Sequence, residues 1–131
     1  KMVEVAAPGV GIESSIPGDL YLTVSGTSQA SPFVANIAGR AVDENPSLSN
    51  SDLKMILMAT VDLKDYLKGK VTSGGIVNVS RALMAAKLSK SMQLFEAIST
   101  SRLQVNDIDP TQSKFQSDEE GYVIPLPSLF Y

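Results

Sequence analysis

Histidine is absent from the chain of 131 residues, and so is cysteine. Without cysteine the chain can form neither a disulfide nor a thiolate metal site, and its composition says nothing about the redox compartment. Without histidine it cannot supply the imidazole that acts as general base in a Ser-His-Asp triad. Any chemistry of that kind would need a histidine from outside these residues.

Long apolar runs and basic clusters are also missing. No apolar stretch approaches the roughly 20 residues needed to cross a bilayer, so no membrane span is expected. The net charge is −3, and no basic patch favours nucleic acid or an anionic membrane as a partner. A hydrophobic content of 44% with 19% charged residues is typical of a globular protein rather than a disordered one.

The most informative stretch is Gly26-Thr-Ser-Gln-Ala-Ser-Pro32. The β-prone segment from Leu20 to Val24 precedes it, and a run of small and apolar residues, Phe33 to Val42, follows it. This order predicts a strand, a tight glycine turn and a helix that begins near Thr27 or Ser28. A serine there either caps the helix or exposes its hydroxyl beside free backbone N–H groups, which can receive a developing oxyanion.

Three landmarks of the chain resemble those of the subtilisin-like serine proteases. The segment Ser25 to Pro32 is similar to the family's nucleophile motif, whose usual form is SGTSMASPHV. Val3-Glu-Val-Ala-Ala-Pro-Gly9 resembles the strand before the nucleophile, and Gly74-Gly-Ile-Val-Asn-Val79 resembles the opening of the last helix of the catalytic domain. The landmarks stand in the family's order and cover about residues 1–87.

The resemblance implies an α/β fold. The chain would be the C-terminal portion of a three-layer arrangement with a mostly parallel sheet, completed by another chain or fragment. Residues 1–87 would belong to the catalytic domain, and residues 88–131 would form a C-terminal extension made of a linker and an apolar tail. Because the chain lacks histidine and an initiator methionine and begins inside the family's catalytic domain, we expect one piece of a cut or split protease.

The resemblance also implies the roles of individual residues. Ser28 would be the catalytic nucleophile, and its backbone N–H would contribute to the oxyanion hole. Val24 and Gln29 would bind substrate on the leaving-group side of the scissile bond, while Gly26 and Thr27 would support the turn. The Asp, His and oxyanion Asn would come from the N-terminal fragment of the same precursor, and the substrate would be a peptide or protein.

The chain departs from the family pattern at two positions. Gln29 stands where the family usually has methionine, which should make oxidative inactivation beside the nucleophile less frequent. Phe33 replaces a histidine that is not the triad base, so it would enlarge the apolar contact under the helix. A pseudoprotease that keeps the fold as a binding or regulatory module is the alternative reading of the same residues.

Cofactors, further partners and location follow from the family alone. No metal site is expected in this chain, whereas calcium could bind the complete protease, and a propeptide and a secreted or periplasmic location are further expectations.

The acidic residues between Asp107 and Glu120 could supply calcium ligands or form a solvated stretch. The apolar segment Tyr122 to Tyr131 is expected to dock on the catalytic domain or on a partner.

The remaining pattern predicts the order of secondary structure. The predicted elements are a strand over Lys1–Ala7, a connecting stretch over Gly9–Gly18, a helix over Leu53–Ala59 with its N-terminus at Ser51-Asp52, a surface excursion over Val61–Lys70, and a helix over Val79–Leu88 capped by Asn78. A bend near Ser89–Ser91 is then expected, the alternative being that this helix continues and packs against two bodies.

Overall fold

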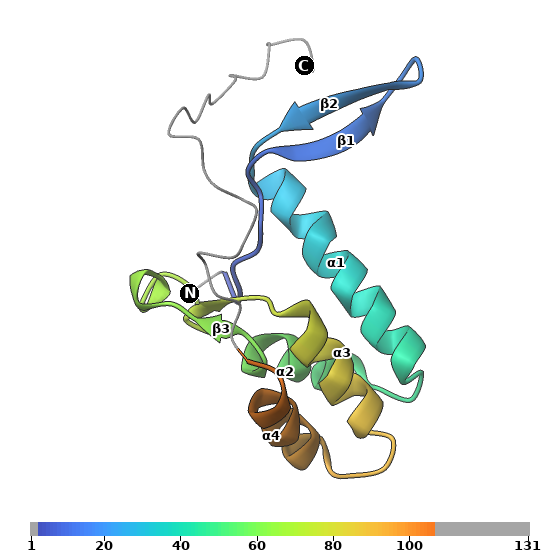
Figure 1. Ribbon diagram of the computed structural model, residues 1–131, viewed down its shortest axis with the longest axis vertical. Helices are drawn as coiled ribbons and strands as arrows, with labels where there is room; N and C mark the ends of the chain where they lie inside the picture. The colour runs from blue at the N-terminus through green and yellow to red at the C-terminus, as the bar shows by residue number, and fades with distance from the viewer. Residues whose placement is uncertain (1–2, 107–131) are drawn as a thin grey trace.

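The computed structural model describes residues 3–106. Four α-helices pack together, and two short hairpins lie at the edges of this group (Figure 1). In chain order the elements are β1 (Ile12–Ile16), β2 (Leu20–Val24), α1 (Thr27–Glu44), α2 (Asn50–Ala59), β3 (Asp62–Leu63), the 3₁₀-helix η1 (Asp65–Leu67), β4 (Gly75–Ile76), α3 (Val79–Leu88) and α4 (Leu94–Gln104).

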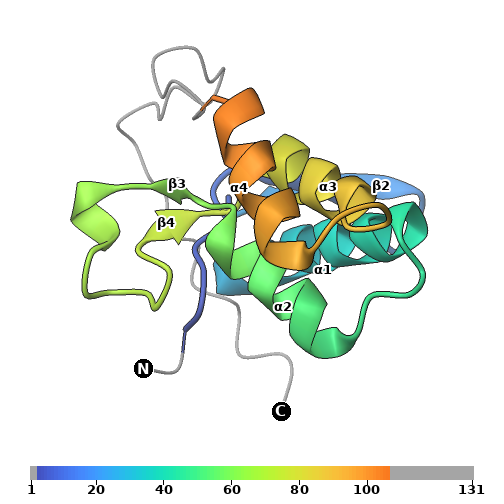
Figure 2. The same cartoon turned by 90° about the horizontal axis from the view of Figure 1, so that it is seen from below.

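The core lies where α3 packs between α1 and α4 (Figure 2). Alanine dominates the facing surface of α3, and Ala85 and Ala86 are completely buried. Their short side chains let the neighbouring helices approach closely, while larger residues fill the remaining space. The buried cluster consists of Ile37, Ala41, Ile56, Val77, Ala82, Ala85, Ala86 and Ile98.

The extended residues 3–7 join the hairpin of β3 and β4. The Ala6 N–H donates to the Gly75 carbonyl at 3.0 Å, and the Val77 N–H donates to the Ala6 carbonyl at 2.9 Å. Ala6 and Ile76 therefore form a parallel bridge, whereas β1–β2 and β3–β4 are antiparallel pairs. The strand predicted over Lys1–Ala7 is thus represented, within the described residues, by an extended segment and this one bridge.

The prediction of a connecting stretch over Gly9–Gly18 is wrong, because β1 lies inside it. β1 pairs with β2 in a register that sets Ile12 opposite Val24 and Ile16 opposite Leu20. The tight turn between the strands places Gly18 at φ 89° and Asp19 at φ 56°, the left-handed region that glycine and aspartate tolerate best. Figure 1 shows this hairpin projecting beyond the N-terminal end of α1.

The helices begin close to the predicted positions. α1 starts at Thr27, as predicted, and α3 starts at Val79. The Asn78 side chain accepts a hydrogen bond of 2.9 Å from the Arg81 N–H, which confirms its role as N-cap. α3 ends at Leu88 before α4 begins at Leu94, so the bend predicted near Ser89–Ser91 is confirmed.

α2 starts before the N-terminus predicted at Ser51-Asp52. The helix begins at Asn50, and Ser49 is its N-cap. The Ser49 hydroxyl accepts a hydrogen bond from the Asp52 N–H, while the Asp52 carboxylate accepts one from the Ser49 N–H, both at 3.1 Å. This reciprocal capping box fixes the earlier boundary because it satisfies N–H groups that the first turn leaves free.

The surface excursion predicted over Val61–Lys70 is only partly correct, because Val61 and Asp62 are buried. The Arg81 guanidinium lies 3.2 Å from the Asp62 carboxylate and donates to the Val105 carbonyl at 2.7 Å. Arg102 of α4 donates to the Ala59 carbonyl at 2.8 Å. These bonds connect α4 to the end of α2 and the start of β3. They also satisfy the buried Arg81 and Asp62 charges, whose burial would otherwise be costly in free energy.

The predictions about the acidic residues from Asp107 to Glu120 and about the tail from Tyr122 to Tyr131 lie outside the described residues. Among the helices of residues 3–106, none is both long and apolar enough to cross a membrane.

Candidate active site

Ser28 lies in the first turn of α1, immediately after the projecting hairpin, and its side chain is exposed. Helical bonding begins with the N–H groups of Gln29 and Ala30, which both reach the Gly26 carbonyl, at 3.1 and 3.3 Å. The Ser28 N–H finds no backbone acceptor among the described residues. A hydroxyl and a free N–H therefore meet at the positive end of a helix.

The backbone before Ser28 is held by Gly9–Gly11. The Gly26 N–H donates to the Gly9 carbonyl at 2.7 Å, and the Gly11 N–H donates to the Ser25 hydroxyl oxygen at 2.9 Å. Space is so tight that a Cβ on Gly9 would lie 2.7 Å from the Gly26 carbonyl oxygen. The position of Ser28 therefore depends on a segment almost twenty residues earlier in the chain.

The residues expected to support the turn lie beside Ser28. Gly26 has an extended backbone with φ 162°, which any residue can adopt. A Cβ there would meet the Gln29 side-chain oxygen at 2.9 Å, so Gln29 folds back over the glycine. Thr27 is the first helical residue and is exposed.

The two expected substrate-binding residues flank this turn. Val24 ends β2 and Gln29 follows Ser28 in α1, and both side chains are half-buried. The structure thus brings Val24, Gln29 and Ser28 into one short stretch between the hairpin and the helix. Substrate contact by Val24 and Gln29 stays a prediction.

Pro32 lies inside α1 and removes one helical hydrogen bond from the turn that carries Ser28. Proline has no N–H, so the Ser28 carbonyl cannot receive the usual helical bond from the residue four positions later. Phe33 follows and packs, half-buried, against the core cluster. The first turn of α1 therefore lacks one bond of the helical ladder, while the Gly9 carbonyl holds its N-cap residue, Gly26.

The electrostatics around Ser28 favour an anion. The first turn of α1 contains no acidic residue that would offset the positive end of the helix dipole. Within residues 3–106, no group of three or more Asp, Glu, His or Cys side chains could hold a metal ion. The local chemistry available to a substrate is thus a hydroxyl, a free backbone N–H and a helix N-terminus.

The sequence did not predict the supporting roles of Gly11 and Ser25. Ser25 falls within the recognised motif, but its hydrogen bond to the Gly11 N–H exists only because β1 and β2 form a hairpin. Since that hairpin was not predicted, the pairing of its two ends could not be predicted either.

A strand, a glycine turn and an exposed serine at a helix start follow one another here, which is the local order in which α/β-hydrolases carry their nucleophile. The chain belongs to the Subtilase family, whose sequence model matches residues 1–107. This is a family of serine endopeptidases.

Several proteases are similar in sequence. The alkaline elastase YaB of Bacillus sp. (strain YaB) is 37% identical over 73 residues, which are 56% of this chain and 17% of the elastase. Subtilisin BL of Lederbergia lenta is 36% identical over 77 residues, 59% of this chain and 25% of that protein. Subtilisin-like protease 1 of Plasmodium falciparum (isolate 3D7) is 34% identical over 99 residues, 76% of this chain and 14% of the protease.

A solved structure supports the fold. A chain from the structure of the subtilase cytotoxin SubAB assembly superposes with a TM-score of 0.59 and 27% identity, covering 79% of this chain and 29% of that one. The present chain therefore spans less than a third of the length of each of these relatives.

Proposed function

We propose that this chain carries the nucleophile of a serine endopeptidase and that Ser28 is that nucleophile. The Ser28 oxygen attacks the carbonyl carbon of a peptide bond, and its proton passes to a histidine and then to the leaving amine. The resulting acyl-enzyme is released by water, which restores the hydroxyl. The Ser28 N–H donates to the oxyanion of each tetrahedral intermediate.

One observation carries this proposal: the exposed Ser28 hydroxyl and the free Ser28 N–H lie together at the start of α1. An oxyanion formed by attack of the hydroxyl would lie within reach of that N–H. Membership of the Subtilase family supplies the reaction class.

The base must come from elsewhere, because the chain contains no histidine. We propose that a separate N-terminal fragment of the same precursor supplies the Asp, the His and the oxyanion Asn. Val24 and Gln29 would then border the leaving-group side of a bound peptide. Calcium, a propeptide and secretion belong to this proposal for the complete protease, by analogy with its relatives.

The test is labelling of the assembled protease with a fluorophosphonate probe, followed by mass mapping of the adduct. We expect the adduct on Ser28 and its loss in Ser28→Ala, together with a fall in peptide hydrolysis of at least about 1,000-fold. Ser31→Ala is the matched control, because Ser31 is an exposed serine one turn further along α1. An adduct on another residue, or no adduct, would overturn the assignment.

Denaturing mass analysis of the same active material tests the partner. We expect a second polypeptide that contains histidine. An active preparation consisting of a single species of 13.9 kDa would contradict the split arrangement.

The absence of histidine also favours a second candidate, a pseudoprotease that binds rather than cuts. In that case the companion polypeptide would lack His or Asp at the site, and Ser28 would not react with the probe. The probe and the companion's sequence therefore separate the two candidates.

A further inference from the structure

An apolar groove of about 520 Å³ lies beside the segment that holds the turn of Ser28. Its walls come from residues 6–10, from the first half of α1, from η1, and from the residues that lead from β4 into α3. Its volume falls within the roughly 300–1,000 Å³ that is typical of ligand sites. The larger apolar side chains that line it are those of Pro8, Val10, Phe33, Tyr66, Leu67 and Val79.

Two of these side chains are largely uncovered, since Val10 is 68% exposed and Tyr66 is 61% exposed. Exposed apolar surface gathered around a groove marks a place where another segment binds. Phe33 and Tyr66 make this groove partly aromatic. Aromatic-lined grooves suit extended, proline-containing segments, because the backbone of such a segment is already restricted and loses little entropy on binding.

The chain itself contains a segment of this kind at residues 122–131, which lie outside the described part. These residues include no charged side chain, three aromatic ones, and prolines at the alternate positions Pro125 and Pro127. The two prolines exclude a helix and favour an extended backbone. Residues 108–131 also lie beyond the part of the chain that the family model matches, so this segment is a feature of the present chain.

The described part of the chain ends close to the groove. The Val105 carbonyl accepts a hydrogen bond of 2.7 Å from Arg81, whose guanidinium also lies 3.2 Å from the carboxylate of Asp62. Asp62 borders the groove, so Val105 is two side-chain contacts away from it. Residues 106–121 could span roughly 50 Å when fully extended, which is ample for residues 122–131 to reach the groove.

The charges at the rim of the groove match the residues that precede this segment. Lys64 borders the groove, is half-buried, and forms no ion pair with any residue between 3 and 106. Asp118, Glu119 and Glu120 come directly before Gly121 and Tyr122. The acidic residues would therefore meet an unneutralised positive charge at the rim, while the uncharged segment enters the groove.

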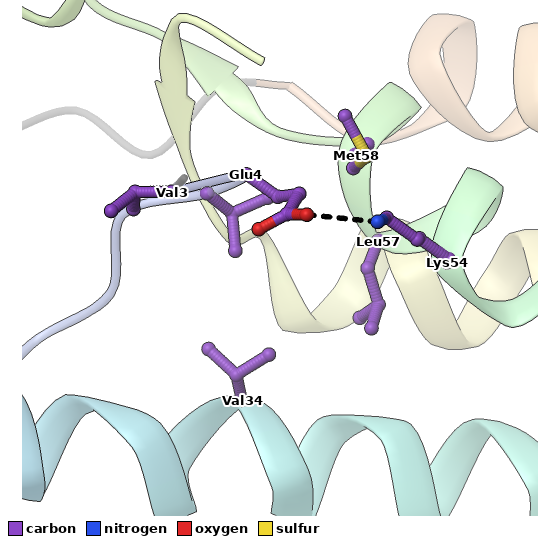
Figure 3. A pocket seen from close by; sticks show the side chains of 7 residues that line it. Val3, Glu4, Val34, Lys54, Leu57 and Met58 are labelled. Atoms are coloured by element: carbon purple, nitrogen blue, oxygen red, sulfur yellow. Dashed lines mark hydrogen bonds and ion pairs between the residues drawn. The ribbon is translucent and has the colours of Figure 1, made fainter. Parts of the chain in front are cut away.

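A second groove, of about 420 Å³, suits this segment less well (Figure 3). Figure 3 shows Lys54 of α2 reaching the Glu4 carboxylate at its edge, and the ion pair of 2.8 Å neutralises both charges. No aromatic side chain from the described residues lines it. It therefore offers neither the free cation nor the aromatic wall of the larger groove.

We propose that residues 122–131 dock in the groove of about 520 Å³ on their own chain, against Phe33 and Tyr66. The proposal does not depend on the chemistry of Ser28. It has a consequence for that residue, because Gly9 lines the same groove and its carbonyl holds the Gly26 N–H at 2.7 Å. The docked segment would support the turn of Ser28 from below.

Photocrosslinking tests the docking in the full chain, kept together with any polypeptide that co-purifies with it. The photoreactive residue p-benzoylphenylalanine replaces Tyr66 at the groove or, as the matched control, Tyr21 of β2, which is 70% exposed and does not line the groove. We expect the Tyr66 position, and not the Tyr21 position, to crosslink to a peptide from residues 122–131 within a single chain of 13.9 kDa.

Every other crosslinking result would overturn the proposal. A crosslink from the Tyr66 position to a second copy of the chain, to a companion polypeptide or to another part of the same chain would show a different occupant. A crosslink from the Tyr21 position to residues 122–131 would place the segment on the hairpin. The absence of any crosslink would show that the groove stays open.

Truncation after Gly121 measures the energetic link between the segment and the groove. We expect the shortened chain to lose at least about 2 °C in Tm. The same truncation should cost less than half as much in Tyr66→Ser, because the groove is already weakened there, and the full amount in Tyr21→Ser. No loss of Tm, or an equal loss in all three backgrounds, would contradict docking against Tyr66.

Discussion

The carbonyl oxygen of Gly9 accepts a hydrogen bond of 2.7 Å from the N–H of Gly26, across the open end of the β1–β2 hairpin. Gly26 is the N-cap of α1, and Ser28 is the second residue of that helix. The contact therefore ties the segment that follows residues 3–7 directly to the turn that carries the candidate nucleophile.

Gly9→Ala should disturb that turn. The new Cβ would lie 2.7 Å from the Gly26 carbonyl oxygen and 3.2 Å from the Ala30 Cβ, so backbone must move. We expect a loss of about 1–3 kcal/mol in the free energy of unfolding, as for other overpacked sites, and a lower kcat. Peptide hydrolysis and thermal unfolding of the assembled protease measure both effects.

Gly39→Ala is the matched control for that change. A Cβ on Gly39 meets nothing within 4 Å among the described residues, and alanine favours the middle of a helix by roughly 0.5–1 kcal/mol. Unchanged activity in Gly9→Ala would show that the close approach to Gly26 does not position Ser28.

Ser25→Ala should lower kcat more than it raises KM. The substitution removes the acceptor of the Gly11 N–H, and this exposed bond is expected to contribute about 0.5–1.5 kcal/mol to stability. Ser25→Thr keeps the hydroxyl and should restore most of the activity. Steady-state kinetics of both variants on one peptide substrate provide the measurement, and equal loss in the two variants would argue against a role for the hydroxyl.

Arg81→Met should destabilise the protein strongly. Its guanidinium is 3.2 Å from the buried Asp62 carboxylate, and it also donates to the buried Val61 carbonyl and to the part-buried Val105 carbonyl. Removing one partner of a buried ion pair typically costs about 3–5 kcal/mol, because the other charge remains buried. Urea unfolding monitored by circular dichroism measures the loss.

Arg40→Met serves as the control for Arg81→Met, since Arg40 is an exposed arginine on α1. It should change the free energy of unfolding by no more than about 0.5 kcal/mol. A similar small change in Arg81→Met would mean that the network around Asp62 does not hold the fold together.

The Glu4–Lys54 pair should make stability depend on acid pH. A hydrogen bond from Lys54, together with its positive charge, lowers the pKa of Glu4 below its ordinary value of 4.5. Because the folded-state pKa is depressed, the contribution is present above 4.5 and is lost as the pH falls through the lower folded value. Both side chains are accessible, so salt should weaken the effect.

Lys54→Met tests this dependence. The pKa of Glu4, followed by NMR, should return towards 4.5, and the acid-side loss of stability from this pair should disappear. Lys68→Met removes a different pair, with Asp65, and should leave the pKa of Glu4 unchanged. An unaltered Glu4 titration in Lys54→Met would contradict the assigned cause.

The sequence predicted the elements whose signals are local. The glycine turn and apolar run placed the start of α1 at Thr27, and Asn78 marked the start of α3 because its amide oxygen can accept an N–H of the first turn. The α/β class and the subtilase family followed from short motifs. The position of Ser28 at the helix start was part of the same pattern.

Features that depend on distant contacts were missed. Most residues of β1 are exposed, so its sequence does not alternate between polar and apolar residues. Neither periodicity nor composition therefore distinguished this strand from a loop. The burial of Asp62 depends on Arg81, nineteen residues later, and no local signal joins the two. The roles of Val24 and Gln29 in substrate binding remain predictions.

Two arginines, one in α3 and one in α4, determine how far the chain could be shortened and still fold. Arg81 and Arg102 both donate to the Val61 carbonyl, and Arg81 also reaches the Val105 carbonyl. Truncation after residue 87 would take away Arg102 and Val105 together, although residues 88–131 were expected to be an extension of the catalytic domain. A recombinant form intended for reconstitution should therefore keep the chain at least through residue 105.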